Sequence, residues 1–162
     1  MFMETGIATS ILLAVATVRG SQQRPDFSGE WILNRQASTL SPGADAAESG
    51  IWWIEHREPT FHHKASFVMA GKPFNYEYEL RSDAGEIVGT QEGTQTVSSL
   101  RWEGDALVVM WRTERAGSAT TISFKYDLIE EGRRLRATEQ LRGTDHVQDN
   151  VWMFDRHRQG VR

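Results

Sequence analysis

The sequence predicts an all-β protein: a single antiparallel up-and-down β-barrel of about eight to ten strands. From residue 29 onward, short segments of alternating polar and apolar residues are separated by turn residues. No segment has a convincing helical period. The chain has 162 residues, enough for one domain that buries a core of its own.

The chain divides into ten expected strands. They cover residues 30–34, 51–57, 60–69, 74–81, 86–90, 94–102, 106–114, 120–129, 134–141 and 150–157. Four of the connections are short and contain Gly85, Gly104, Gly117 or Gly132, where a tight hairpin needs a positive φ. The connection over residues 35–50 is long and rich in Ser, Ala and Gly, which is typical of functional or mobile loops.

The first expected strand carries the features of a plug. Gly29 lets another piece of backbone approach, and Trp31 then opens a run of sheet-favouring residues. A Trp buries on the order of 200 Å², enough to fill the narrow end of a closed sheet. The alternative is an ordinary core Trp.

Three motifs resemble one family. Gly29-Glu30-Trp31 resembles the Gly-x-Trp signature of lipocalins and of lipocalin-like (calycin-type) secreted bacterial β-barrel proteins. The run from Trp102 to Val109 resembles the W-x-G-D-x-L-V hairpin of the same bacterial proteins, and the last strand, 152–156, ends in arginine. The resemblance covers residues 25–158.

The resemblance implies three features. An arginine from the last strand, Arg156 or Arg158, should pack across Trp31, with Gly29, Trp31 and Arg156 as structural residues. The alternative is that Arg156 is a solvated charge. The loop 35–50 should fold over the open mouth as a lid, or else is a disordered insertion. The interior should bind or carry a small hydrophobic molecule.

Composition excludes several classes of function. With no cysteine, disulfides and thiolate chemistry are impossible. The net charge of −4 argues against a nucleic-acid partner. Motifs for a metal, a phosphate loop, a dinucleotide or a serine nucleophile are missing from the sequence, so no metal and no cofactor are expected.

The N-terminal residues differ from the rest. Residues 7–18 form an apolar run, too short for a stable membrane span but typical of the hydrophobic region of a signal peptide. Ala14-Val15-Ala16 offers a cleavage site, although the preceding residues include Glu4 and no basic residue. We expect residues 1–20 to be a signal peptide and the protein to be secreted or periplasmic; the alternative is a buried or frayed helix.

Alternation assigns side chains to the interior of the barrel. The aromatic members of the inward sets form the expected ligand-binding surface: Phe61, Phe67, Phe74, Tyr76, Tyr78, Trp111, Phe124 and Tyr126. Met69 and Ile122 also belong to the inward sets. A barrel of this size either fills with side chains or holds one small molecule, here an apolar or aromatic one.

Two inward residues are titratable. His63 and Glu139 each lie within an apolar stripe, and a buried carboxylate needs a partner. The candidate partners of Glu139 are His63, three tyrosines (Tyr76, Tyr78 and Tyr126) and, with a shifted register, Arg81.

These residues leave three hypotheses. The first is a carrier of a small hydrophobic molecule, in which a buried His63–Glu139 pair only fixes register or orients a polar ligand. The second is a cofactor-independent isomerase, cyclase, hydratase or lyase with His63 and Glu139 as catalytic acid and base. The third is a barrel that is packed solid and acts through its surface.

Overall fold

The computed structural model describes residues 23–157, so the expected signal peptide and Arg158 lie outside the described residues. The described chain forms ten strands and one short 3-10 helix. The strands are β1 (Gly29–Leu33), β2 (Ala47–Arg57), β3 (Thr60–Met69), β4 (Lys72–Arg81), β5 (Glu86–Gln91), β6 (Thr94–Glu103), β7 (Ala106–Arg115), β8 (Ser118–Ile129), β9 (Arg134–Arg142) and β10 (Val147–Arg156). The helix is η1 (Ala44–Ala46).

All ten strands belong to one antiparallel sheet in the order β4-β3-β2-β1-β10-β9-β8-β7-β6-β5. Strands that are consecutive in sequence therefore pair with each other, except β4 and β5, and β1 pairs with β10. This confirms the all-β, up-and-down fold. Gly104 and Gly117 adopt φ values of 62° and 78° in their hairpin turns, as expected.

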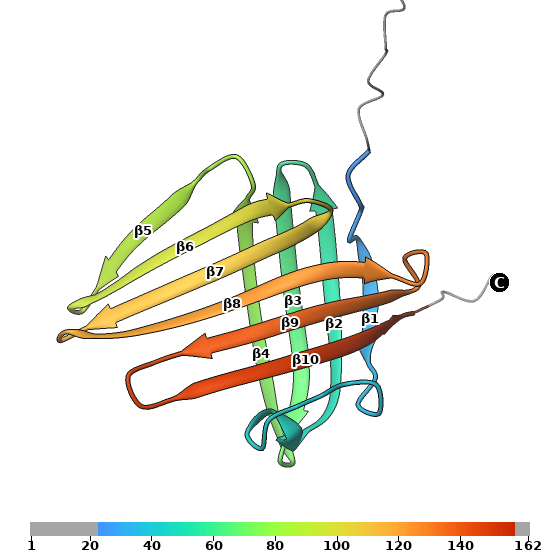
Figure 1. Ribbon diagram of the computed structural model, residues 1–162, viewed down its shortest axis with the longest axis horizontal. Coiled ribbons are helices and arrows are strands. Elements are labelled where there is room, and N and C mark those ends of the chain that lie inside the picture. The colour runs from blue at the N-terminus through green and yellow to red at the C-terminus, as the bar shows by residue number, and fades with distance from the viewer. Residues whose placement is uncertain (1–22, 158–162) are drawn as a thin grey trace, which may run out of the picture.

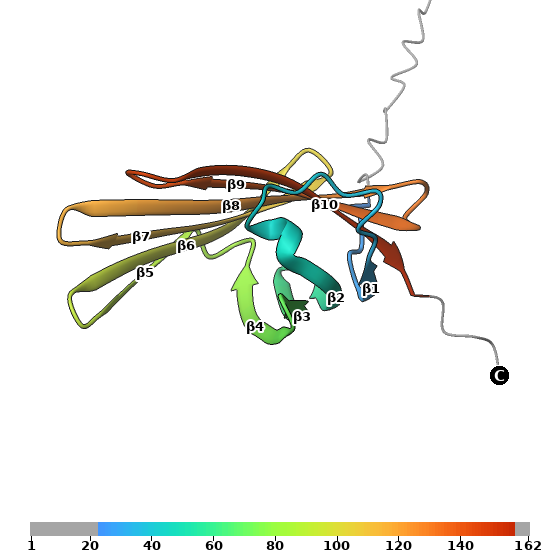
Figure 2. The same cartoon turned by 90° about the horizontal axis from the view of Figure 1, so that it is seen from below.

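The sheet folds into two layers. Strands β1–β4 cross steeply behind β5–β10 in Figure 1, and Figure 2 shows the two layers from below. Strands β4 and β5 stand at the two ends of the strand order, so hydrogen bonds do not close the barrel between them. The barrel therefore has one open seam, because β5 diverges from β4 after their shared turn (Figure 1).

Some strand ends differ from expectation. Strand β2 begins at Ala47 and not at residue 51, because Ala47, Ser49 and Gly50 pair with residues of β3 across a β-bulge. Strand β10 likewise begins at Val147, paired with Arg142. Ala47 and Gly50 are poor strand formers, so pairing with β3 and not intrinsic propensity decides their conformation.

Trp31 lies in the core, and Arg156 of the last strand packs against its ring. The Trp31 side chain is fully buried, and its Nε1 donates to the Phe27 carbonyl at 3.0 Å. The Arg156 guanidinium lies 4.1 Å from the Trp31 ring centroid and donates to the carbonyls of Ser28 and Gly132. A Cβ on Gly29 would lie 2.8 Å from Arg156 Nη1, and Gly29 has φ 145°, so only glycine fits there.

A polar cluster lies beside Phe27. His56 is 8% exposed, and its Nε2 donates to Glu58 at 3.0 Å while the Phe27 N–H faces its Nδ1. Trp102 Nε1 and the Ser82 hydroxyl also donate to Glu58, at 2.8 and 2.9 Å. Burial alone would raise the pKa of Glu58, but these hydrogen bonds outweigh it and lower that pKa below the usual value.

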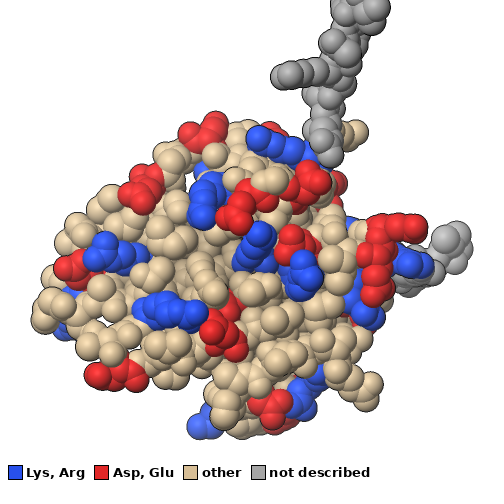
Figure 3. All heavy atoms as spheres, viewed as in Figure 1, with Lys and Arg blue, Asp and Glu red and all other residues tan. Residues whose placement is uncertain are grey.

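The face of the protein shown in Figure 3 carries charged side chains of both signs. Acidic and basic side chains are interspersed over it. Among residues 23–157, no helix is long and apolar enough to cross a bilayer.

Candidate functional site: a cavity between the two layers

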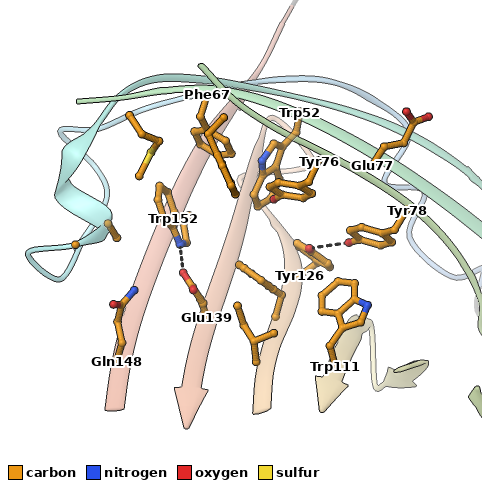
Figure 4. A pocket seen from close by; sticks show the side chains of 16 residues that line it. Trp52, Phe67, Tyr76, Glu77, Tyr78, Trp111, Tyr126, Glu139, Gln148 and Trp152 are labelled. Carbon is orange, nitrogen blue, oxygen red and sulfur yellow. Dashed lines mark hydrogen bonds between the residues drawn. The ribbon is translucent and has the colours of Figure 1, made fainter. Parts of the chain in front are cut away.

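A cavity of about 600 Å³ lies between the two layers of strands (Figure 4). Its size is within the usual range of small-molecule sites. The residues that line it are Gly43, Ala44, Trp52, Phe67, Met69, Phe74, Tyr76, Glu77, Tyr78, Trp111, Ile122, Phe124, Tyr126, Glu139, Gln148 and Trp152. Phe74 is 53% exposed, so the cavity reaches solvent along β4.

Seven of the eight expected ligand-binding side chains line this cavity. They are Phe67, Phe74, Tyr76, Tyr78, Trp111, Phe124 and Tyr126. Phe61 does not line it. Its ring is fully buried, in edge contact with Phe27 and stacked on Tyr126. Alternation gives the correct face for Phe61 but not its depth along the barrel.

The structure adds two tryptophans to the expected set. Trp52 on β2 and Trp152 on β10 line the cavity (Figure 4). Trp52 stacks on Phe154 with ring centroids 3.9 Å apart, which fixes its orientation. The period-two pattern of both strands could have found them, since Trp52 alternates with Ile54 and Trp152 with Phe154.

The connection between β1 and β2, residues 34–46, covers one side of the cavity. Gly43 and Ala44 belong to the lining. Thr39 exchanges two backbone hydrogen bonds with Val151 of β10, each of 2.8 Å, and Ser38 Oγ accepts from the Met153 N–H. The loop is thus attached to β10 along its length, and it covers the cavity as expected of a lid.

Three tyrosines give the cavity a neutral polar surface. Tyr78 and Tyr126 share a hydrogen bond of 3.0 Å between their hydroxyls (Figure 4). Burial raises the pKa of Tyr76, Tyr78 and Tyr126 well above 10. These hydroxyls therefore stay protonated at neutral pH.

His63 is enclosed by aromatic rings. Its side chain is fully buried, and neither ring nitrogen has a hydrogen-bond partner among the described residues. The rings of Trp52, Tyr76 and Tyr78 lie 4.7, 5.5 and 5.0 Å from the imidazole, centroid to centroid. Burial, with a smaller contribution from the charge of His62, lowers the pKa of His63 to about 3. His63 is therefore neutral at neutral pH.

Glu139 is 6% exposed and faces the cavity. Its Oε2 accepts hydrogen bonds from Asn150 Nδ2 at 2.9 Å and from Trp152 Nε1 at 2.6 Å. Asn150 lies directly opposite Glu139 in the β9–β10 ladder, and Trp152 is the next inward residue of β10. Asn150 Oδ1 in turn accepts from the Ser41 N–H of the covering loop at 2.6 Å.

The expected pair of His63 and Glu139 is not formed. No hydrogen bond or ion pair joins them, and the tyrosines and Arg81 do not bond to Glu139 either. The partners of Glu139 come from β10, and the residue pattern of a single strand does not reveal the register between strands. Since His63 does not line the cavity, the structure does not assemble the two groups as an acid–base pair around one substrate.

Potential metal ligands are also dispersed. Within residues 23–157, no group of three or more His, Asp or Glu side chains is arranged to hold a metal ion.

Solved structures share this fold. Secretory abundant heat soluble protein 4 from Ramazzottius varieornatus is 12% identical, covers 85% of this chain and 100% of its own, and has a TM-score of 0.50. A second secretory abundant heat soluble protein structure from the same organism has 12% identity, coverage of 80% and 94%, and a TM-score of 0.53. A fatty acid binding protein of Schistosoma mansoni in complex with arachidonic acid has 12% identity, coverage of 82% and 96%, and a TM-score of 0.46.

The two likenesses with TM-scores of 0.50 and 0.53 show a shared fold. The ten-stranded antiparallel architecture is calycin-like, in agreement with the resemblance found in the sequence. No protein-family model matches the chain, and no curated protein matches its sequence.

Proposed function

We propose that this protein binds one small hydrophobic molecule in the cavity between its two layers, as a carrier or a sequestering protein. The proposal rests on the size of the cavity and on the aromatic residues that line it. An open space of about 600 Å³ remains among three tryptophans, two phenylalanines besides the exposed Phe74, and three tyrosines. Well-packed interiors do not leave a void of that size, so the third hypothesis, a solid barrel, does not fit.

The apolar lining favours an apolar occupant. Transfer of apolar surface from water into such a site contributes roughly 25 cal/mol per Å². The neutral tyrosine hydroxyls and Glu139 are few and fixed in position, which is the usual arrangement for orienting a mainly apolar ligand.

Native mass spectrometry of gently purified protein is the first test. A discrete apolar adduct, identified after extraction, supports the proposal. Titration with N-phenyl-1-naphthylamine, an uncharged probe excited directly, then measures the affinity of the site. We expect saturable binding of one probe per chain. Absence of any adduct together with absence of probe binding would contradict the proposal.

A substitution in the covering loop locates the probe. Gly43 has φ −69°, and a Cβ there would have only Gln148 Oε1 nearby, at 3.6 Å. Gly43→Trp is therefore compatible with the backbone and adds bulk at the cavity wall, so probe binding should weaken. Ala37→Trp, at an exposed position of the same loop that does not line the cavity, is the matched control and should bind as the wild type does.

Export remains a proposal based on the apolar run at residues 7–18. N-terminal sequencing of the chain recovered from its natural source tests it. A start between residues 17 and 26 supports cleavage of a signal peptide, and a start at residue 1 contradicts it.

A further inference from the structure

The charged groups of the cavity are all acidic. Among the described residues, no lysine, arginine or histidine contributes to the lining, whereas Glu77 and Glu139 do. Glu77 is exposed, and its Oε1 accepts from His62 on the outer face at 2.7 Å. In Figure 4 the Glu77 carboxylate points away from the cavity and that of Glu139 points into it. Glu139 is therefore the charged group that an occupant meets.

The two oxygens of Glu139 differ in their surroundings. Oε2 accepts both hydrogen bonds, from Asn150 and Trp152, and these hold the side chain in place. Oε1 has no hydrogen-bond partner among the described residues. The polar side-chain atoms that are both fully buried and unpaired are Ser41 Oγ, Trp52 Nε1 and the two nitrogens of His63, and Oε1 is not one of them. Oε1 is thus held in place and can accept a hydrogen bond from a molecule in the cavity.

A fixed acceptor selects the polar end of a ligand. A carboxylate at this position would meet a second carboxylate in apolar surroundings with no cation to compensate, which is costly. An alcohol can donate one hydrogen bond to Oε1, and an ammonium can donate one that is charge-assisted and stronger.

We propose that the cavity selects apolar molecules that end in a hydrogen-bond donor, an amine or an alcohol, over apolar carboxylates, and that Glu139 Oε1 accepts the hydrogen bond from that end. This inference rests on the proposed function, since it names the ligand class of the same cavity. The expected order of affinity for one apolar chain is amine, then alcohol, then carboxylate.

Calorimetric titration of the wild type with decylamine, 1-decanol and decanoate at pH 7.5 tests the order. Decylamine should bind at least about tenfold more tightly than decanoate, the lower limit for a hydrogen bond to a charged group. Equal affinities, or tighter binding of decanoate, would overturn the inference. This comparison needs no variant, so it stands even if substitutions at Glu139 impair folding.

Two matched variants assign the selectivity to one residue. Glu139→Gln keeps an oxygen for Asn150 and Trp152 but directs an amide donor into the cavity, so decylamine should lose its advantage and decanoate should gain. Glu79→Gln removes an exposed carboxylate of the neighbouring strand β4 that does not line the cavity, and should leave the order unchanged. If Glu139→Gln keeps the wild-type order, Glu139 is not the selecting group.

The outcomes separate this inference from the proposed function. If N-phenyl-1-naphthylamine and decanol bind but the amine has no advantage over decanoate, the inference fails and the proposed function holds. If none of these compounds binds, the proposed function fails and the inference fails with it.

Discussion

Acid should destabilise this protein through one buried histidine. His63 is fully buried with both ring nitrogens unpaired, and its pKa in the folded protein is lowered to about 3. In the unfolded chain, a histidine titrates near 6.5. Between these values the unfolded state binds a proton that the folded state does not, so stability falls as the pH is lowered.

The magnitude follows from the difference in pKa. Each pH unit between the two pKa values changes the free energy of unfolding by about 1.4 kcal/mol per group. From pH 7 to pH 4.5, His63 should therefore reduce that free energy by about 2–3 kcal/mol. The tyrosines that surround His63 do not contribute in this range, because burial raises their pKa values well above 10.

His63→Phe isolates the effect. The variant keeps an aromatic ring among those of Trp52, Tyr76 and Tyr78 but cannot bind a proton. Urea unfolding curves, followed by Trp fluorescence from pH 7 to pH 4.5, give the free energy of unfolding of both proteins. The difference between them should change by about 2–3 kcal/mol in favour of the variant as the pH falls.

Two controls make the result decisive. His62→Gln removes the neighbouring histidine, whose side chain points to the outer face and contacts Glu77, and should keep most of the acid sensitivity. If His63→Phe is too large for its site, His63→Leu serves the same comparison. Parallel pH profiles for the wild type and the His63 variants would refute the argument.

Three further predictions concern other parts of the fold. Arg156→Lys should reduce the free energy of urea unfolding by about 2–4 kcal/mol, because lysine loses the stacking on Trp31 and the hydrogen bonds to two carbonyls. A loss below about 0.5 kcal/mol would mean that Arg156 does not stabilise the packing of Trp31. Gly50→Ala, whose Cβ would collide with the Phe67 ring, should cost about 1–3 kcal/mol in thermal unfolding, whereas Gly89→Ala, on the open strand β5 with nothing within 4 Å, should be nearly neutral. Hydrogen bonds keep the pKa of Glu58 below its unfolded value of about 4.5, so its contribution to stability is present above that pH and is lost as the pH falls further. Glu58→Gln should therefore flatten the dependence of stability on pH below pH 4.5 and not above it.

The sequence by itself determined which residues face the interior. Alternation in a strand has a period of two residues, and this local rule placed Phe67, Tyr76, Tyr78 and Trp111 correctly on the cavity wall. The motif Gly29-Glu30-Trp31 and the final arginine likewise predicted the packing of Arg156 on Trp31, because close approach at a glycine and stacking on an indole depend on residue type.

Only the tertiary structure decided how deep each inward side chain lies and which residues it bonds to. Phe61 and His63 share the inward face with Phe67, but their place along the crossing of the two layers puts them in the core and not on the cavity wall. Glu139 bonds to Asn150 and Trp152 because the β9–β10 register sets those side chains beside it.

The tertiary structure also decided whether the space between the two layers is filled by side chains or left open. Composition allows the same aromatic residues to fill a barrel or to line a pocket. In the structure a cavity of about 600 Å³ remains, given the open seam between β4 and β5, the steep crossing of the layers and the loop over residues 34–46. A side chain's direction is fixed by its own backbone, whereas its neighbours across the sheet and the volume left between them depend on register and layer geometry, which no single strand encodes.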